Sequence, residues 1–183
     1  MREVDFREAT ASDVPSVQPL VHHAYRGDRA RQGWSHEADL LDAARIDEQA
    51  LYEAVADPSQ TILLAERDGE LIGCVQVTDK GDGLAYLGML TVQADLQDQG
   101  LGRRLIAEAE TLARTRYAAT RMEMTVIVQR GELIEWYQRR GYVLTGETRP
   151  FPATDPRFGI PRRSDLAFVV MEKSLSDRAD RKA

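Results

Sequence analysis

Apolar positions in the sequence either alternate with polar ones or form short runs, which is typical of β-strands. Strands are predicted at residues 2–7, 61–66, 70–77, 84–92 and 122–128, and near Tyr142 and Ala167. Asp68 and Gly69 lie between the second and third of these segments, and this residue pair favours a tight hairpin. The pattern therefore predicts that these two strands form a hairpin.

Between the predicted strands lie segments in which apolar residues recur at the spacing of an α-helix. Val14, Val17, Leu20, Val21 and Ala24 follow a helix-start signal at residues 10–13, and one or two helices are predicted over residues 37–56. Further helices are predicted at residues 101–118 and 132–140, and a loop at residues 26–35. Strands followed by intervening helices indicate a mixed α/β fold.

Length and composition favour one domain without a membrane span. The chain has 183 residues, of which 43% are hydrophobic, and it has neither an apolar run of the length a membrane helix needs nor a basic-then-apolar leader. We expect a single domain at residues 1–173, a polar tail at residues 174–183 and a cytoplasmic location.

The charge balance and the few metal-ligating residues limit the classes of partner and cofactor. A net charge of −6 argues against nucleic acid or an anionic membrane surface as the main partner, and suits a cationic amine weakly. The single cysteine, Cys74, lies in an apolar segment, which favours a buried and inert thiol. The three histidines lack metal-ligand spacing with it, so no metal is expected.

Two glycines between the strand at 84–92 and the following amphipathic helix indicate an anion site. Gly100 and Gly102 allow close approach of the backbone, and the free N–H groups of a helix N-terminus attract phosphate. Arg103 and Arg104 add positive charge at the same end. The segment lacks the Gly-Lys-Ser/Thr ending of a P-loop and the third glycine of a dinucleotide fingerprint, where Leu105 stands.

The run Gln97-Asp98-Gln99-Gly100-Leu101-Gly102 resembles the coenzyme-A-binding segment of the GNAT superfamily of N-acetyltransferases. Residues 137–142, Tyr-Gln-Arg-Arg-Gly-Tyr, resemble the second signature of that family. The resemblance implies a mostly antiparallel central sheet of six to seven strands, flanked by helices and splayed between the fourth and fifth strands. It also implies acetyl-CoA as cosubstrate.

The resemblance assigns cofactor contacts to main-chain groups of the third long strand, to the glycine loop and to the helix after it. The residues concerned are Leu90, Thr91, Val92, Gln97, Asp98, Gln99, Gly100, Leu101, Gly102, Arg103, Arg130 and Tyr137. In many family members a tyrosine at the position of Tyr137 protonates the departing thiolate. Arg130 stands where many relatives have an asparagine that touches the cofactor, and it is expected to meet a phosphate.

The acceptor site is expected to include loop aromatics and a polar group near the cofactor strand. Trp34 and Phe151 lie in predicted loops, where aromatic residues form pocket walls or cover a core. Tyr86 occupies the position at which histone-acetylating relatives place a glutamate. Glu37, Asp39 and Glu123 are acids that could reach the cleft or lie on the surface, and the general base stays open.

The resulting hypothesis is transfer of an acetyl group from acetyl-CoA to a small-molecule amine by direct attack in a ternary complex. Two alternatives stay open: a non-catalytic acyl-CoA sensor, and a transferase that acts on a protein amine or uses a longer acyl group. Relatives are often dimers, so a homodimer is open as well.

Overall fold

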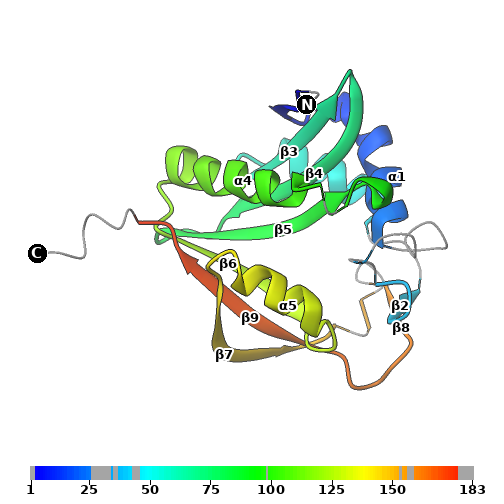
Figure 1. The fold of residues 1–183 in the computed structure, drawn as a ribbon, viewed down its shortest axis with the longest axis vertical. Helices are drawn as coiled ribbons and strands as arrows, with labels where there is room; N and C mark the ends of the chain where they lie inside the picture. Colours follow the sequence, from blue (N-terminus) through cyan, green and yellow to red (C-terminus); the bar gives the residue numbers. More distant parts are fainter. Residues whose placement is uncertain are drawn as a thin grey trace, which may run out of the picture.

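The structure, a computed structural model, describes residues 3–25, 34, 37–42, 46–97, 99–152, 154–155 and 159–176. Its centre is a seven-stranded sheet in the order β1-β3-β4-β5-β6-β9-β7 (Figure 1). β5 and β6 run parallel, and the other neighbouring pairs are antiparallel. The mixed, mostly antiparallel sheet implied by the sequence is confirmed. The strands are β1 (Asp5–Glu8), β3 (Gln60–Arg67), β4 (Glu70–Asp79), β5 (Leu84–Val92), β6 (Arg121–Ile127), β7 (Val143–Pro150) and β9 (Ala167–Ser174).

The hairpin between β3 and β4 forms at the predicted residue pair. Asp68 and Gly69 have φ angles of 53° and 79°, the left-handed values that a tight two-residue turn requires. Glycine adopts this conformation without strain, and aspartate tolerates it better than most residues. The turn thus fixes the pairing of β3 with β4.

Helices cover both faces of the sheet. α1 (Val14–Tyr25) and α3 (Glu48–Ala56) pack on one face, and α4 (Leu101–Tyr117) and α5 (Gly131–Gln138) lie on the other (Figure 1). The helix start predicted at residues 10–13 is a capping box that leads into α1. Among the helices of the described residues, none is long and apolar enough to cross a membrane.

The region predicted as one or two helices over residues 37–56 differs from that expectation. A short strand, β2 (Leu41–Asp42), pairs with β8 (Ile160–Pro161), and only α3 follows it within the described residues. Leu41 is 2% exposed and packs with Ile127 and Leu166. This contact with a distant strand overrides the local helical spacing.

The last strand extends slightly beyond the domain boundary expected at residue 173. β9 extends through Ser174, and Leu175 is buried in the core. Residues 177–183 of the expected polar tail lie outside the described residues.

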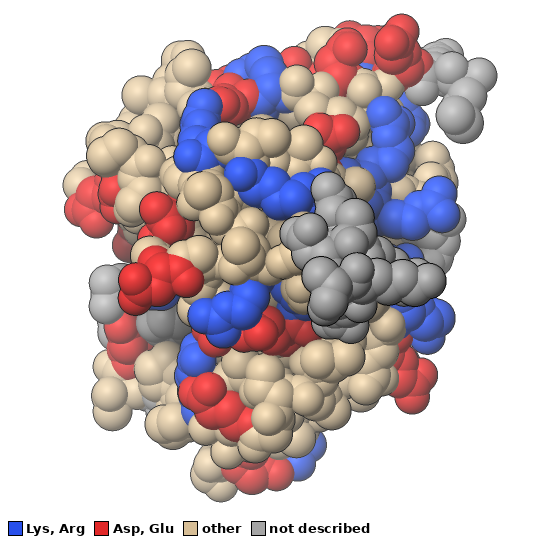
Figure 2. All heavy atoms as spheres, turned by 90° about the vertical axis from the view of Figure 1, so that its left-hand side faces the viewer, with Lys and Arg blue, Asp and Glu red and all other residues tan. Residues whose placement is uncertain are grey.

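Surface charge is mixed on the face shown in Figure 2. Lys and Arg side chains lie among Asp and Glu side chains there, without one broad basic area. Such charges also pair in the structure, as where Arg149 binds both Glu123 and Glu147.

Gly73 on β4 lets α4 approach the sheet closely. A Cβ atom at this position would lie 2.8 Å from the Thr91 carbonyl oxygen and 3.0 Å from the Leu105 side chain. We expect Gly73→Ala to lower the free energy of unfolding by about 1–3 kcal/mol, because a backbone atom would have to move. Chemical denaturation measures the change.

Gly88→Ala is the matched control for this substitution, because the nearest atom to an added Cβ would be in the Tyr86 ring at 3.4 Å, an ordinary contact. It should cost less stability than Gly73→Ala. Equal stability of the two variants would contradict the close packing of α4 on β4.

Candidate active site

The two parallel strands at the centre of the sheet separate along their length. β5 and β6 pair only at their beginnings, from Leu84 to Tyr86 on β5. The Tyr86 hydroxyl and Thr125 Oγ1, 2.7 Å apart, bridge the strands where they diverge. The splay expected between the fourth and fifth strands of the sheet is therefore confirmed. It leaves backbone groups of β5 available to a ligand, as at an open sheet edge.

A bulge in β5 lies beside this gap. Met89 has a φ of 52°, a left-handed value that costs a non-glycine residue about 1–3 kcal/mol, and the register with β4 shifts there. Its carbonyl accepts a hydrogen bond from the Thr91 hydroxyl at 3.0 Å. The next residue, Leu90, lines the gap, and its carbonyl accepts a hydrogen bond from the Tyr25 hydroxyl at the end of α1.

The glycine loop connects β5 to α4 and is held by side-chain contacts. Gly100 is the N-terminal cap of α4 with a φ of 80°, so the first N–H groups of the helix face the loop. Gln97 accepts a hydrogen bond from the Trp34 backbone N–H at 2.9 Å and donates one to the Val92 carbonyl at 3.4 Å. A Cβ at Gly102 would lie 3.3 Å from the Trp136 ring, a tight contact, so glycine lets that ring lie close over the helix start.

A groove runs from this loop to the gap between β5 and β6. This groove, called the cofactor groove because the sequence predicts cofactor contacts along it, has a volume of about 430 Å³. Its described lining residues include Arg103 and Arg140 but no acid. The Arg140 guanidinium stacks on Trp136 with its Cζ 3.4 Å from the ring centroid, and its Nε is buried without a hydrogen bond among the described residues. Burial, then the nearby Arg139 and Arg103, lower the pKa of Arg140. Both arginines favour an anionic ligand.

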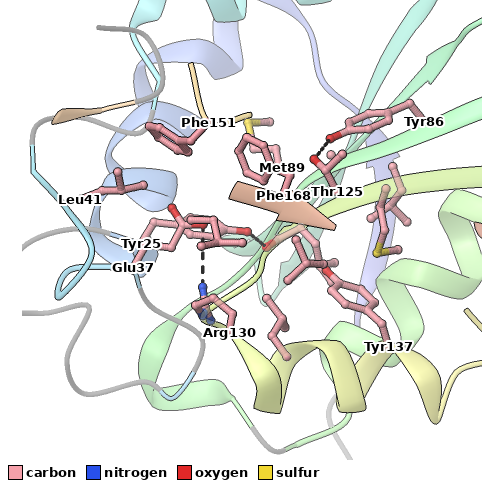
Figure 3. Close-up of a pocket in the computed structure, with 17 residues that line it drawn as sticks. Tyr25, Glu37, Leu41, Tyr86, Met89, Thr125, Arg130, Tyr137, Phe151 and Phe168 are labelled. Atoms are coloured by element: carbon pink, nitrogen blue, oxygen red, sulfur yellow. Dashed lines mark hydrogen bonds and ion pairs between the residues drawn. The ribbon is translucent and has the colours of Figure 1, made fainter. Parts of the chain in front are cut away.

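A second, smaller cavity of about 120 Å³ lies deeper between the strands. This inner pocket is shown in Figure 3, where Tyr86 and Thr125 lie on one side and the ion pair of Glu37 and Arg130 on another. It shares four residues with the cofactor groove: Tyr25, Leu90, Leu133 and Tyr137. The two cavities therefore meet where the strands are splayed.

Tyr137 on α5 stands at this junction. Its side chain is 7% exposed and packs edge-on against Trp136 and Tyr142, with ring centroids 5.1 and 5.9 Å away. Burial, followed by the neighbouring Tyr25, raises the pKa of the Tyr137 phenol above its usual value, against a smaller lowering by Arg130. The phenol thus stays protonated at neutral pH and can donate a proton to a group in either cavity.

Most residues predicted to contact the cofactor line the groove, and a few lie elsewhere. The lining includes Leu90, Val92, Gln97, Gln99, Gly100, Gly102, Arg103 and Tyr137. The side chains of Thr91 and Leu101 are buried in the fold, so only their backbone groups are available. Arg104 donates to the Val4 carbonyl at 3.2 Å, beside Phe6, and does not line the groove. Asp98 lies outside the described residues.

The residues predicted for the acceptor divide between the two cavities. Glu37, Tyr86 and Phe151 line the inner pocket, whereas Trp34 lines the cofactor groove. Arg130, expected to meet a phosphate of the cofactor, lines the inner pocket instead. Arg130 is the N-terminal cap of α5, and its guanidinium lies opposite Glu37.

Of the remaining acids, Glu123 is held by Arg149 at 2.9 and 3.1 Å. Cys74 is fully buried, and burial raises the pKa of its thiol to about 12, which confirms the predicted inert thiol. Within the described part of the chain, His, Cys, Asp and Glu form no cluster that could hold a metal ion.

Among the residues of the cofactor groove that sequence reasoning missed are Tyr25, Trp136 and Arg140. Tyr25 ends an amphipathic helix that is far from the glycine loop in sequence. Trp136 and Arg140 are four residues apart, a helical spacing that brings their side chains together. This spacing is the sequence signal from which their contact could have been predicted.

Comparison with known families gives one match over most of the chain. The Acetyltransferase (GNAT) domain family matches residues 30–151. None of the curated protein sequences is significantly similar to the chain.

Several solved structures share the fold. The Salmonella typhimurium protein yncA, solved with its cofactor acetyl-CoA, has a TM-score of 0.69 at 22% identity over 99% of both chains. The ribosomal-protein-S18-alanine N-acetyltransferase of Escherichia coli has a TM-score of 0.70 at 15% identity, again over 99% of both chains. A chimera of Vibrio cholerae spermidine N-acetyltransferase SpeG and hSSAT has a TM-score of 0.70 at 17% identity over 97% of this chain and 99% of that one. At identities this low, the similarity shows a shared fold and no more.

Proposed function

Because the chain belongs to the GNAT acetyltransferase family, we propose that it transfers an acetyl group from acetyl-CoA to a primary amine by direct attack in a ternary complex. The observation that supports this most is the meeting of two cavities at Tyr137, between the splayed strands β5 and β6. One cavity suits a long anionic cosubstrate, and the other suits a small acceptor. A reaction between two bound molecules needs such a junction.

The cofactor groove fits coenzyme A in its chemistry. The amides at the start of α4 and the closely packed Gly102 would hold the pyrophosphate, and Arg103 and Arg140 would balance its charge. The unpaired edge of β5 near Leu90 would accept the amide-containing arm by strand-like pairing.

Tyr137 supplies the proton that the reaction requires. Acetyl-CoA, when bound, provides an acetyl group activated as a thioester. As the new C–N bond forms and the C–S bond breaks, the amine would release one proton to solvent and the leaving thiolate would gain one. Tyr137 donates its phenolic proton to that sulfur and is reprotonated from solvent. Its raised pKa keeps the donor form available.

Direct transfer is favoured because Cys74, the one cysteine of the sequence, is buried and its thiol pKa is raised to about 12. An acetyl-enzyme would therefore need another nucleophile. A stable acetylated enzyme, seen by intact-protein mass spectrometry after mixing with acetyl-CoA alone, would overturn the ternary-complex mechanism.

The proposal is tested by following thiol release from acetyl-CoA with a panel of amines. Structural neighbours named for spermidine and for ribosomal protein S18 make a polyamine and an N-terminal alanine peptide useful members beside free amino acids. Amine-dependent thiol release with an acetylated product supports the proposal. Cofactor binding without turnover on any amine favours the sensor alternative. A cytoplasmic location and a homodimer stay predictions from the sequence.

A further inference from the structure

The inner pocket contains two opposite charges side by side. Glu37 and Arg130 are the charged residues among its described lining, with Glu37 Oε1 and Arg130 Nη1 3.8 Å apart (Figure 3). Their side chains are only 13% and 9% exposed, respectively. Charges this deep are screened little by solvent, so their pairing matters more than at the surface.

The guanidinium of Arg130 is incompletely paired. The 3.8 Å separation from Glu37 is too long for a hydrogen bond, and no described residue accepts one from the buried Nη1. A buried N–H group of a charged side chain without an acceptor is unfavourable, so the pocket favours a ligand that brings an anionic oxygen. A carboxylate matches a guanidinium with two parallel hydrogen bonds.

One wall of the pocket is apolar. Phe151 and Phe168 lie with ring centroids 5.4 Å apart and pack with Leu41 in one cluster. Both rings and Leu41 line the pocket (Figure 3). The wall therefore suits an aliphatic or thioether side chain, and the small volume excludes a large one.

We propose that the acceptor is a free α-amino acid with an apolar side chain, whose carboxylate is bound by Arg130 and whose amino group lies toward Glu37. This inference rests on the proposed function and names the substrate class of the same site. An α-amino acid carries its two opposite charges a few atoms apart, as the pocket does. A simple amine would leave the buried Nη1 of Arg130 without a hydrogen-bond acceptor, and a peptide N-terminus has no carboxylate beside its amine.

The test compares L-leucine with L-leucinamide as acceptors in the thiol-release assay, with alanine, valine and methionine pairs in parallel. Each pair differs in the carboxylate alone. The amide has the more readily deprotonated amine, so a preference for the acid must come from the protein. For at least one pair we expect kcat/KM to be at least about tenfold higher for the amino acid, mainly through KM.

Arg130→Gln should abolish this preference, and Arg130→Lys should restore part of it. The matched control is Arg121→Gln, which removes an exposed arginine paired with Glu172 at the other end of β6 and should keep the preference. Circular dichroism checks that the variants fold.

The inference is wrong if the wild-type protein uses amides as well as the acids, or better, which would point to peptide N-termini. It is also wrong if Arg130→Gln lowers both rates equally, or if polyamines react and no amino acid does. These outcomes leave the proposed function intact. Failure of every amine, together with failure to bind acetyl-CoA, would instead contradict the proposed function itself.

Discussion

Tyr137→Phe should lower kcat by about 10²–10⁴, the usual contribution of a positioned general acid, while acetyl-CoA affinity changes little. The substitution removes only the phenolic hydroxyl group, whose proton would go to the thiolate. The phenyl ring keeps its packing against Trp136 and Tyr142, with centroids 5.1 and 5.9 Å away, so the junction between the two cavities should keep its shape. Thiol release at saturating substrates measures kcat, and calorimetry measures the dissociation constant.

The matched control is Tyr117→Phe. Its hydroxyl lies 2.7 Å from Thr61 Oγ1, and it lines neither cavity, so the same chemical change should leave kcat unaffected. Because burial raises the pKa of Tyr137, the wild-type kcat should show no fall from loss of its proton up to about pH 9. If Tyr137→Phe retains the wild-type kcat, another group protonates the thiolate and the role of Tyr137 is wrong.

Gly102→Val should weaken acetyl-CoA binding by about tenfold to a hundredfold, because a branched side chain has no room beneath the Trp136 ring. An added Cβ alone would lie 3.3 Å from that ring, and the Val92 side chain is 3.8 Å away. Displacement of Trp136 would also disturb Arg140, which stacks on it. Calorimetric titration with acetyl-CoA measures the loss.

Ala107→Val controls for the lower helix propensity of valine, since Ala107 lies on the exposed side of the same helix. Its dissociation constant should equal that of the wild-type protein. Equal affinities for Gly102→Val and Ala107→Val would place the cofactor elsewhere.

The sequence predicted those parts of the fold whose signals are local. Gly100 and Gly102 stand between a strand and an amphipathic helix, and Asp68-Gly69 marks a two-residue turn, so each element could be predicted from a short window. β5 was expected at residues 84–92 and forms at Leu84–Val92. The splay of β5 from β6 came from the family resemblance, since no local pattern specifies where two strands separate.

The parts that sequence did not predict depend on contacts between distant residues. Leu41 joins β2 because it packs with Ile127 and Leu166, which overrides a helical pattern. The Tyr25 hydroxyl reaches the Leu90 carbonyl across 65 residues of sequence, and no spacing rule indicates this contact. Arg130 was expected at a phosphate by its place before Tyr137, and the fold instead brings it opposite Glu37.

The most direct test of the central claim is a calorimetric titration of the wild-type protein with acetyl-CoA. We expect one binding event per chain with a dissociation constant of about micromolar magnitude, as the groove with Arg103, Arg140 and the glycine loop predicts. Absence of binding at millimolar acetyl-CoA would contradict an acetyl-CoA-dependent transferase, whatever the acceptor.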